Sequence, residues 1–157
     1  MEIEYLKQLQ NNPIPYPNEK EFNGEIKGIS ESKITYLEQL YNNGNPFPIV
    51  LKELLYLAGK SCYVIDWGPF VKQEELQQFV REVIQEENHI ITRPFYVFDS
   101  TSGIYLFIYL DEGDNPSYHV MDPYEPDSSK WIKKWNKTIQ QLVNDGVELV
   151  KEGLTPF

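Results

Sequence analysis

The chain has 157 residues, of which 41% are hydrophobic and 24% are charged, and it contains a single cysteine, Cys62. This size and composition are typical of one globular domain that buries a core without disulfides or a structural metal. The formal net charge is −10, and residues 61–127 carry it, since they hold 3 basic and 13 acidic side chains. Such acidity disfavours binding to nucleic acid and to anionic membranes. The expected partner is a basic protein, unless the acids serve only solubility.

The N-terminal sequence MEIEYLKQLQ is acidic and lacks the basic start and apolar run of a signal peptide. No stretch approaches the roughly 18 consecutive apolar residues of a membrane span. We therefore expect a cytoplasmic protein without membrane contact. A short N-terminal helix is predicted, followed by an irregular segment over 11–29 that holds several prolines and glycines.

Three helices are predicted in the first half of the chain. Ser30 is placed to cap the first, which runs to about Asn43. Pro48 opens the second, which continues through Ala58 and is apolar around so much of its circumference that it must be largely buried. The third, over about 72–87, has apolar residues at helical spacing and Gln and Glu on the rest of its surface, so it is predicted to be amphipathic.

Strand-like runs over 89–99, 104–110 and 117–122 are separated by STSG and DEGDNP, which are turn sequences. A last helix is predicted from Ser128 or Ser129 onward, because Trp131, Trp135 and Ile139 repeat at helical spacing, with a break possible at 144–146. Together these elements predict an α+β fold: one domain over 1–157, with an antiparallel meander of at least three strands flanked by helices.

If Asp99 pairs with Ile104 and Leu110 with Ser117, alternation divides the meander into two sides. The aliphatic side would suit the buried helix. The other side would be aromatic, and it is either a second core layer or a partly open binding platform. The first side would hold Phe95, Val97, Ile104, Leu106, Ile108, Leu110, His119 and Met121, and the second Tyr96, Phe98, Tyr105, Phe107, Tyr109, Tyr118, Val120 and Asp122.

Two segments in this order resemble the signature blocks of the SUKH superfamily. In PFPIVLKELLYLAG the matching positions are Pro48, Lys52, Glu53 and Leu55, whereas Leu51, Leu54 and Ala58-Gly59 replace the usual Tyr, Phe and Asn-Gly. In PFYVFDSTSGIYLFIYLDEGDNPSYHV the matching positions are Asp99, Gly103, Phe107, Asp111, Pro116 and Tyr118. The resemblance covers about 34–135, and residues 1–30 lie outside it as an N-terminal extension.

The resemblance implies an α+β domain without catalysis. Bacterial members of that superfamily are mostly immunity proteins that bind and neutralise toxins of competing bacteria, and fungal members regulate cell-wall assembly. The expected function is therefore neutralisation of a polymorphic or contact-dependent toxin. The alternatives are a non-enzymatic regulatory or scaffold module that binds proteins and, third, a small hydrolase that uses the carboxylates of Asp99 and Asp122.

The sequence offers few residues in the patterns of catalytic, cofactor-binding or metal-binding sites. No nucleotide-binding loop, nucleophile elbow or His-Glu-x-x-His motif is present, and His89 and His119 lack partners at metal-ligand spacing. Neither a cofactor nor a metal is expected, and Cys62 is interpreted as a small core residue rather than a nucleophile. Trp67, in the turn Asp66-Trp67-Gly68-Pro69, is interpreted either as an anchor of that loop or as a contact residue.

The predicted partner-binding surface combines aromatic anchors with an acidic rim, the arrangement expected of a tight inhibitor of a basic toxin. All of these residues are expected at strand ends and turns of the meander, beside its aromatic side. The anchors are Tyr109, Tyr118 and Tyr124, and the rim comprises Asp99, Asp111, Glu112, Asp114, Asp122, Glu125 and Asp127.

Overall fold

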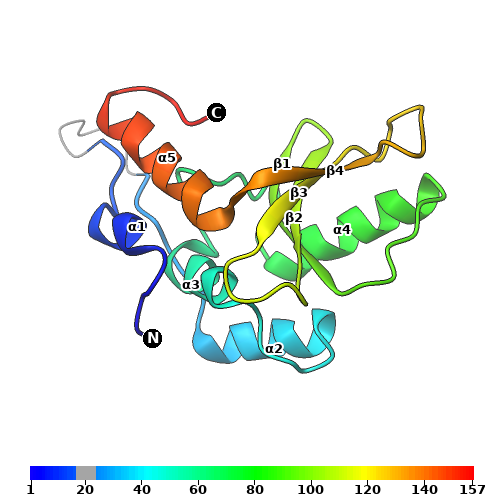
Figure 1. Cartoon of the computed structure of the whole chain (residues 1–157). Helices are drawn as coiled ribbons and strands as arrows, with labels where there is room; N and C mark the ends of the chain where they lie inside the picture. The colour runs from blue at the N-terminus through cyan, green and yellow to red at the C-terminus, as the bar shows by residue number, and fades with distance from the viewer. Residues whose placement is uncertain (17–23) are drawn as a thin grey trace.

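The computed structural model describes residues 1–16 and 24–157, which form an α+β fold with helices packed against an antiparallel sheet (Figure 1). The predicted fold class is confirmed. The irregular segment predicted over 11–29 includes residues 17–23, which lie outside the described residues. The helices are α1 (Lys7–Asn11), α2 (Glu31–Tyr41), α3 (Ile49–Ala58), α4 (Gln73–Glu86) and α5 (Ile139–Lys151). The strands are β1 (Phe95–Thr101), β2 (Ile104–Tyr109), β3 (Ser117–Met121) and β4 (Ile132–Thr138).

The helices of the first half follow their sequence signals. The Ser30 hydroxyl accepts the backbone N–H of Lys33 at 3.2 Å and caps α2, as predicted. Pro48 directly precedes α3, whose apolar residues are buried around most of the helix. None of the helices in the described part of the chain is long and apolar enough to cross a membrane.

The sheet is a meander with the strand order β1-β2-β3-β4. Its register differs from the predicted one: Asp99 lies opposite Leu106, and Thr101 lies opposite Ile104. The cause is the turn, because Ser102 (φ 53°) and Gly103 (φ 81°) both adopt left-handed backbone and form a two-residue hairpin loop. A bulge between Val97 and Asp99 shifts the register again farther along β1.

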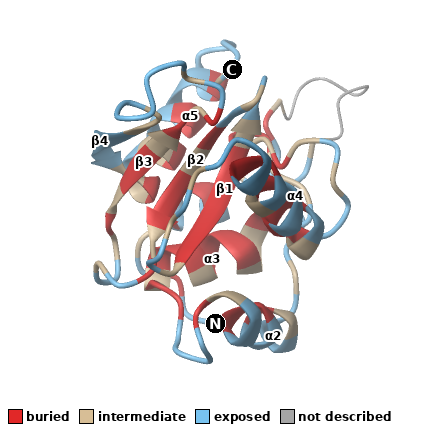
Figure 2. Ribbon diagram, turned by 90° about the vertical axis from the view of Figure 1, so that its right-hand side faces the viewer, coloured by how far each residue is buried: buried red, intermediate tan, exposed pale blue. Residues whose placement is uncertain are grey.

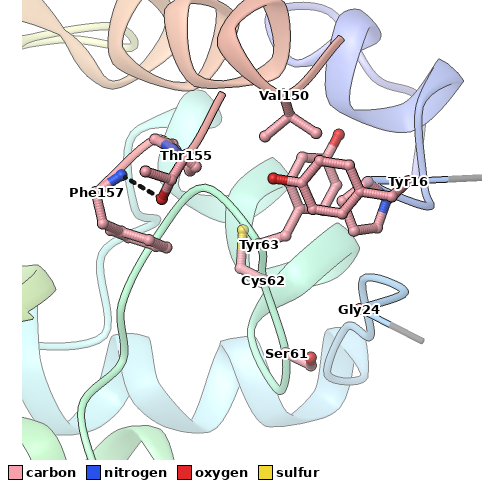
Figure 3. Close-up of a pocket in the computed structure, with 10 residues that line it drawn as sticks. Tyr16, Gly24, Ser61, Cys62, Tyr63, Val150, Thr155 and Phe157 are labelled. Atoms are coloured by element: carbon pink, nitrogen blue, oxygen red, sulfur yellow. Dashed lines mark hydrogen bonds between the residues drawn. The ribbon is translucent and has the colours of Figure 1, made fainter. Parts of the chain in front are cut away.

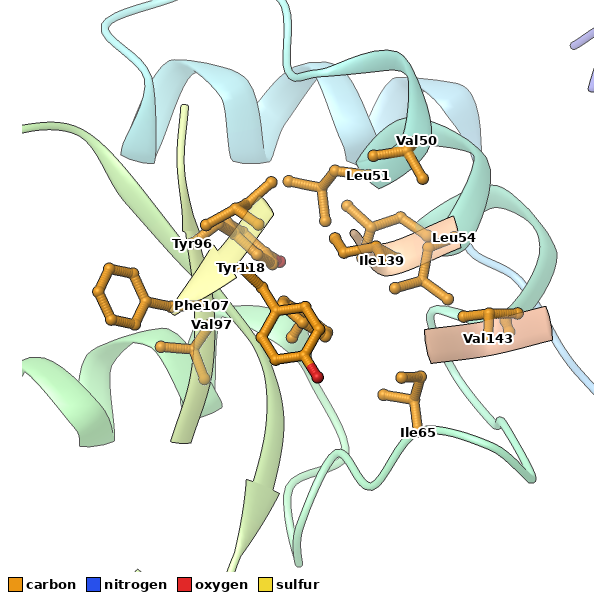
Figure 4. Packing of buried hydrophobic residues seen from close by; sticks show 14 of the residues in the cluster. Val50, Leu51, Leu54, Ile65, Tyr96, Val97, Phe107, Tyr118, Ile139 and Val143 are labelled. Carbon is orange, nitrogen blue, oxygen red and sulfur yellow. The ribbon is translucent and has the colours of Figure 1, made fainter. Parts of the chain in front are cut away.

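The prediction of one aliphatic and one aromatic side is therefore wrong. Phe107 lies opposite both Val97 and His119, so these three residues share a face of the sheet. Tyr96 and Tyr118 point toward α3 and α5, whereas Val97 and Phe107 lie on the other side of the strands (Figure 4). All four are buried, so the aromatic residues of the strands belong mostly to the core rather than to an open platform.

A fourth strand occupies residues that were predicted as helix. Residues Ile132–Thr138 form β4, and the last helix begins only at Ile139, capped by the Thr138 hydroxyl. The predicted helix start at Ser128 or Ser129 is wrong, because the free edge of β3 takes this segment as its antiparallel neighbour.

The predicted break at 144–146 is also absent. Gly146 lies inside α5, where a Cβ atom would approach the side chain of Val64 to 3.0 Å. The glycine therefore allows close packing of the helix on the chain around Val64 rather than ending the helix.

The two edges of the sheet differ. At β1 the side-chain amide of Gln77 in α4 donates to the Val97 carbonyl at 2.7 Å and accepts from the Val97 N–H at 3.0 Å. Arg81 donates to the Phe95 carbonyl at 2.9 Å. Residues of β4 are exposed along most of the strand, whereas β1 is buried (Figure 2). The helix α4 thus closes one edge of the sheet, and the other edge faces solvent.

The N-terminal segment is held by Glu53, a fully buried carboxylate of α3. It accepts the backbone N–H groups of Glu4, Tyr5 and Leu6 at 2.6, 2.9 and 2.9 Å. The Gln140 amide of α5 donates to the Tyr5 carbonyl at 3.1 Å, so the first residues also contact the last helix.

Candidate functional site

An aromatic groove opens where the β1–β2 turn meets the loop before α4. It has a volume of about 690 Å³, and of the described residues that line it one is acidic and none is basic. These residues, which define the aromatic groove, are Asp66, Gly68, Pro69, Phe70, Phe79, Ser100, Ser102, Gly103, Tyr105 and Tyr124.

The walls of the aromatic groove present partly exposed rings. Phe70 and Phe79 lie with ring centroids 5.2 Å apart, and the side chain of Phe79 is 42% exposed. Tyr124 is 58% exposed, whereas Tyr105 is buried at the base of the groove. Exposed rings fixed on a framework lose little conformational entropy when they bind, which makes them effective anchors for a protein partner.

The loop that forms one wall is tied to β1 through Asp99. Its carboxylate accepts the Asp66 N–H at 3.2 Å and the Thr101 hydroxyl at 3.2 Å, and the Ser100 N–H donates to the Asp66 carbonyl at 2.8 Å. Burial raises the pKa of Asp99 to about 6. Asp99 therefore holds in place the loop that forms this wall of the groove, and it is itself only 8% exposed.

Trp67 anchors the same loop. Its indole N–H donates to the Ala58 carbonyl at 2.9 Å, and the side chain is buried. Of the two interpretations of Trp67, the structure therefore favours the anchor.

The predicted partner-binding residues do not form one rim. Tyr124 lies beside Gly103 at the β1–β2 turn, whereas Tyr109 ends β2 at the opposite end of that strand. Tyr118 is buried and packs edge-on against Phe98 at a centroid distance of 5.7 Å, so it is a core residue. The structure thus separates the predicted surface into two groups.

The first group accompanies the aromatic groove. Asp122, Glu125 and Asp127 belong to the turns around Tyr124, where the Asp122 carboxylate accepts the Tyr124 N–H at 3.0 Å and the Glu125 carboxylate accepts the Asp127 N–H at 3.2 Å. These acids and Asp66 give the surroundings of the aromatic groove a negative charge.

The second group is already paired. The Arg93 guanidinium lies 3.8 Å from the Tyr109 ring centroid and binds Asp111 at 2.6 Å and Glu112 at 2.9 Å. Its hydrogen bond lowers the pKa of Asp111. Asp114 lies in the same loop and contributes its backbone carbonyl to the N–H of Val50. Because the single charge of Arg93 offsets one of the two negative charges of Asp111 and Glu112, this end of the sheet offers less free negative charge than expected.

The helical spacing of the sequence places Phe79 with the other apolar residues of the amphipathic helix predicted over about 72–87, and nothing in the sequence singles out Phe70. The core of α4 consists of Leu76, Val80, Val83 and Ile84, and Phe79 lies at the margin of that apolar stripe. The position of Phe79 at the margin of the apolar stripe was the one signal in the sequence that this ring could be exposed. Phe70 follows Gly68-Pro69 in a loop, and only the tertiary structure brings its ring beside Phe79.

A second cavity, of about 230 Å³, lies near the C-terminal residues (Figure 3). Its lining includes Cys62, Tyr63 and Phe157, and also Tyr16 and Gly24, which flank the residues outside the described part. Burial raises the pKa of the Cys62 thiol to about 11, so the thiol is protonated and weakly nucleophilic at neutral pH.

The two histidines have structural surroundings. His89 stacks on Trp131 with ring centroids 4.1 Å apart, and its Nε2 lies 2.9 Å from the Pro123 carbonyl. His119 is buried beside Tyr109, and burial lowers its pKa. Among residues 1–16 and 24–157, no group of three or more His, Cys, Asp or Glu side chains is arranged to hold a metal ion.

Comparison with known proteins gives no assignment. Neither a protein-family model, nor a curated protein, nor a solved structure matches this chain.

Proposed function

We propose that this protein acts by stoichiometric binding of a basic protein, and that its partner is a toxin of competing bacteria that it neutralises. The aromatic groove is the proposed docking site. The observation that carries the proposal is the combination of exposed rings, chiefly Phe79 and Tyr124, with a lining that includes Asp66 and, among the described residues, no base.

The physical argument separates two contributions. Aromatic anchors that lose water in a complex slow dissociation, whereas surrounding charges mainly accelerate association with a partner of opposite sign. The rings would slow dissociation, and Asp66, Asp122 and Glu125 beside them would accelerate association. The net charge of −10 acts in the same direction at longer range.

The toxin-neutralising form of the proposal rests on the SUKH resemblance. Its two sequence blocks correspond to α3 and to the meander, and they are in contact, since the Val50 N–H of one donates to the Asp114 carbonyl of the other at 3.1 Å. The two matched blocks therefore pack against each other as parts of one unit.

The test begins with the toxin domain encoded beside the gene for this chain, expressed with and without the protein. We expect the protein to restore growth and to form a one-to-one complex. Tyr124→Ala or Phe79→Ala should weaken binding by about 2 kcal/mol, which is about thirtyfold in Kd, mainly through faster dissociation. Tyr36→Ala is the matched control, because Tyr36 is a similarly exposed tyrosine on α2, away from the aromatic groove.

A charge test distinguishes the two acidic groups. The triple variant Asp122→Asn, Glu125→Gln, Asp127→Asn keeps oxygen acceptors for the turns and should slow association and flatten its dependence on salt. The control Asp111→Asn, Glu112→Gln removes two carboxylates at the opposite end of β2, away from the aromatic groove, and should therefore change association less per charge removed.

The outcomes separate the alternatives. Complex formation without restored growth would favour the regulatory or scaffold module over toxin neutralisation. Binding that is indifferent to Tyr124→Ala and Phe79→Ala would reject the aromatic groove as the docking site.

A further inference from the structure

The free edge of the sheet carries an inference that goes beyond the proposed function and uses no residue of the aromatic groove. The β1 edge is capped by Gln77, Arg81 and the Asp66 carbonyl, but β4 has strand-forming backbone and no covering element among the described residues. An edge that a protein leaves open is a template for a further strand.

The hydrogen-bond alternation identifies which backbone groups face outward. The Asp122 N–H donates to the Trp131 carbonyl at 2.8 Å, so residues 131 and 133 direct their peptide groups toward β3. Ile132 and Lys134 then direct theirs toward solvent. Within residues 1–16 and 24–157, no segment other than β4 itself forms a backbone hydrogen bond with Ile132 or Lys134.

The side chains of this edge are basic in an otherwise acidic chain. Residues 128–144 hold Lys130, Lys133, Lys134 and Lys137 and no acid. Lys130 pairs with Asp127 at 3.3 Å and Lys137 with Asp145 at 2.8 Å, whereas Lys133 and Lys134 form no ion pair with a described residue. The two lysines without a counter-charge are thus Lys134, which bears an outward backbone group, and Lys133, which lies between the two outward residues.

Trp135 adds an apolar contact at the same edge. β4 bulges between Lys134 and Thr138, where three residues lie opposite one residue of β3, and Trp135 in this bulge is 49% exposed. The bulge limits regular pairing to a short stretch, so an added strand would depend on its side chains as well as on its backbone.

We propose that β4 binds an extended acidic segment of a partner protein by strand addition. Its peptide groups would pair with those of Ile132 and Lys134, and its carboxylates would contact Lys133 and Lys134. A second copy of this chain is a poor occupant, because antiparallel pairing of β4 with itself would place these lysines against their own counterparts. Single-stranded nucleic acid and anionic membranes are poorer occupants than an acidic polypeptide, because neither offers the alternating N–H and C=O groups that would pair with Ile132 and Lys134.

The test uses a synthetic peptide of about eight residues, a typical strand length, in which pairs of Glu alternate with pairs of Val. Lys133 and Lys134 lie on opposite faces of β4, and adjacent glutamates of an added strand also point to opposite faces, so each lysine can meet a carboxylate. We expect the amide protons of Ile132 and Lys134 to become protected from hydrogen exchange when the peptide is added, while that of Lys133, already directed at β3, changes little. The same peptide with Lys in place of Glu should not bind. An acidic peptide with N-methyl groups along its pairing edge should lose binding, because its charge remains but its donors are removed.

The variant Lys133→Glu, Lys134→Glu should weaken binding at least about tenfold, which is about 1.4 kcal/mol. The control Lys7→Glu, Lys60→Glu makes the same charge change at two exposed lysines away from β4. Circular dichroism should show that both variants are folded, and protection at Ile132 reports the edge directly in the unmodified protein.

Three results would overturn the proposal. They are absence of protection at millimolar peptide, equal binding of the N-methylated peptide, and stronger binding of oligothymidylate or phosphatidylserine vesicles than of the acidic peptide. None of them bears on the aromatic groove, so this proposal and the proposed function fail independently.

Discussion

Glu53 shows how a single buried carboxylate orders a distant segment. Three backbone N–H groups of residues 4–6 converge on it, and no side chain caps the start of α1 at Leu6. Only the Leu6 N–H belongs to the start of α1, so the carboxylate mainly tethers the residues before this helix to α3. Its sequence position marked it only as a match to the α3 block, because its partners are backbone groups 47 to 49 residues away.

Replacing Glu53 by Gln should lower the free energy of unfolding by about 2 kcal/mol, because a charge-assisted acceptor is lost and the amide N–H₂ opposes a backbone donor. Urea denaturation measures this change. Hydrogen exchange at residues 4–6 should accelerate more than exchange in the sheet. Lys52→Gln changes the neighbouring residue, which takes no part in the hydrogen bonds of residues 4–6 to Glu53, and should leave both readouts near wild type. Equal exchange rates in Glu53→Gln and wild type would contradict the tether.

Asp99 should give the protein a distinctive dependence of stability on pH. Its pKa is about 6 in the folded protein, raised by burial from 3.8, so the folded state holds a proton that the unfolded chain releases between these values. Its contribution to stability is therefore greatest below about pH 4 and is lost as the pH rises through about 6, by at most roughly 3 kcal/mol.

Asp99→Asn keeps an oxygen for the Asp66 N–H and an N–H₂ for the Thr101 hydroxyl but does not ionise. Its stability relative to wild type should therefore rise between about pH 4 and pH 7, measured by urea denaturation at each pH. Asp111→Asn should show the opposite sign at lower pH, because the pKa of Asp111 is lowered by Arg93. A flat profile for Asp99→Asn would show that this carboxyl ionises normally.

At the scale of elements, α2 and α3 could be predicted because each combines an apolar period with a local start signal, Ser30 or Pro48, and α4 could be predicted from its apolar period alone. The strand β4 could not, since Trp131, Trp135 and Ile139 recur every four residues as in a helix. The unsatisfied edge of β3 decides the outcome, and that edge exists only in the folded sheet. The register was missed for a local reason, the tight Ser102-Gly103 turn and the bulge after Val97.

The side-chain amide of Gln77 in α4 forms two hydrogen bonds with the backbone of Val97 in β1, and this clamp yields a prediction. Gln77→Ala would leave the buried N–H and carbonyl of Val97 without partners, so the free energy of unfolding should fall by about 2 to 4 kcal/mol. Gln78→Ala is the matched control, because Gln78 is exposed and its amide contacts only Glu82. Thermal denaturation compares the two variants, and a loss in Gln77→Ala no larger than that in the control would disprove the clamp.

At the scale of the whole molecule, the candidate site was only partly predictable. Tyr124 and its neighbouring acids lie beside the aromatic groove, but Tyr118 is core and Tyr109 lies at the other end of β2. Arg93 was not foreseen as the partner of Asp111 and Glu112, because no local pattern links a residue before β1 with a turn after β2.

The excess of acids predicts that salt stabilises the protein. With a net charge of −10 and a calculated isoelectric point of 4.6, repulsion among carboxylates opposes the compact state at neutral pH. Raising NaCl from about 0.02 M to about 0.5 M should increase the melting temperature by about 2 to 4 °C. The same addition at a pH near the isoelectric point should have little effect, and an equal increase there would point to a cause other than charge screening.

The contact between the N-terminal segment and α5 also has a consequence for synthesis of the chain. The Gln140 amide and the Tyr5 carbonyl are separated by 135 residues, which a ribosome adds in roughly 7 to 27 s. Throughout that interval the apolar side chains of Ile3, Leu6 and Leu9 lack their α5 neighbours. The nascent chain must therefore keep its first apolar side chains from misassociating until its last helix has emerged.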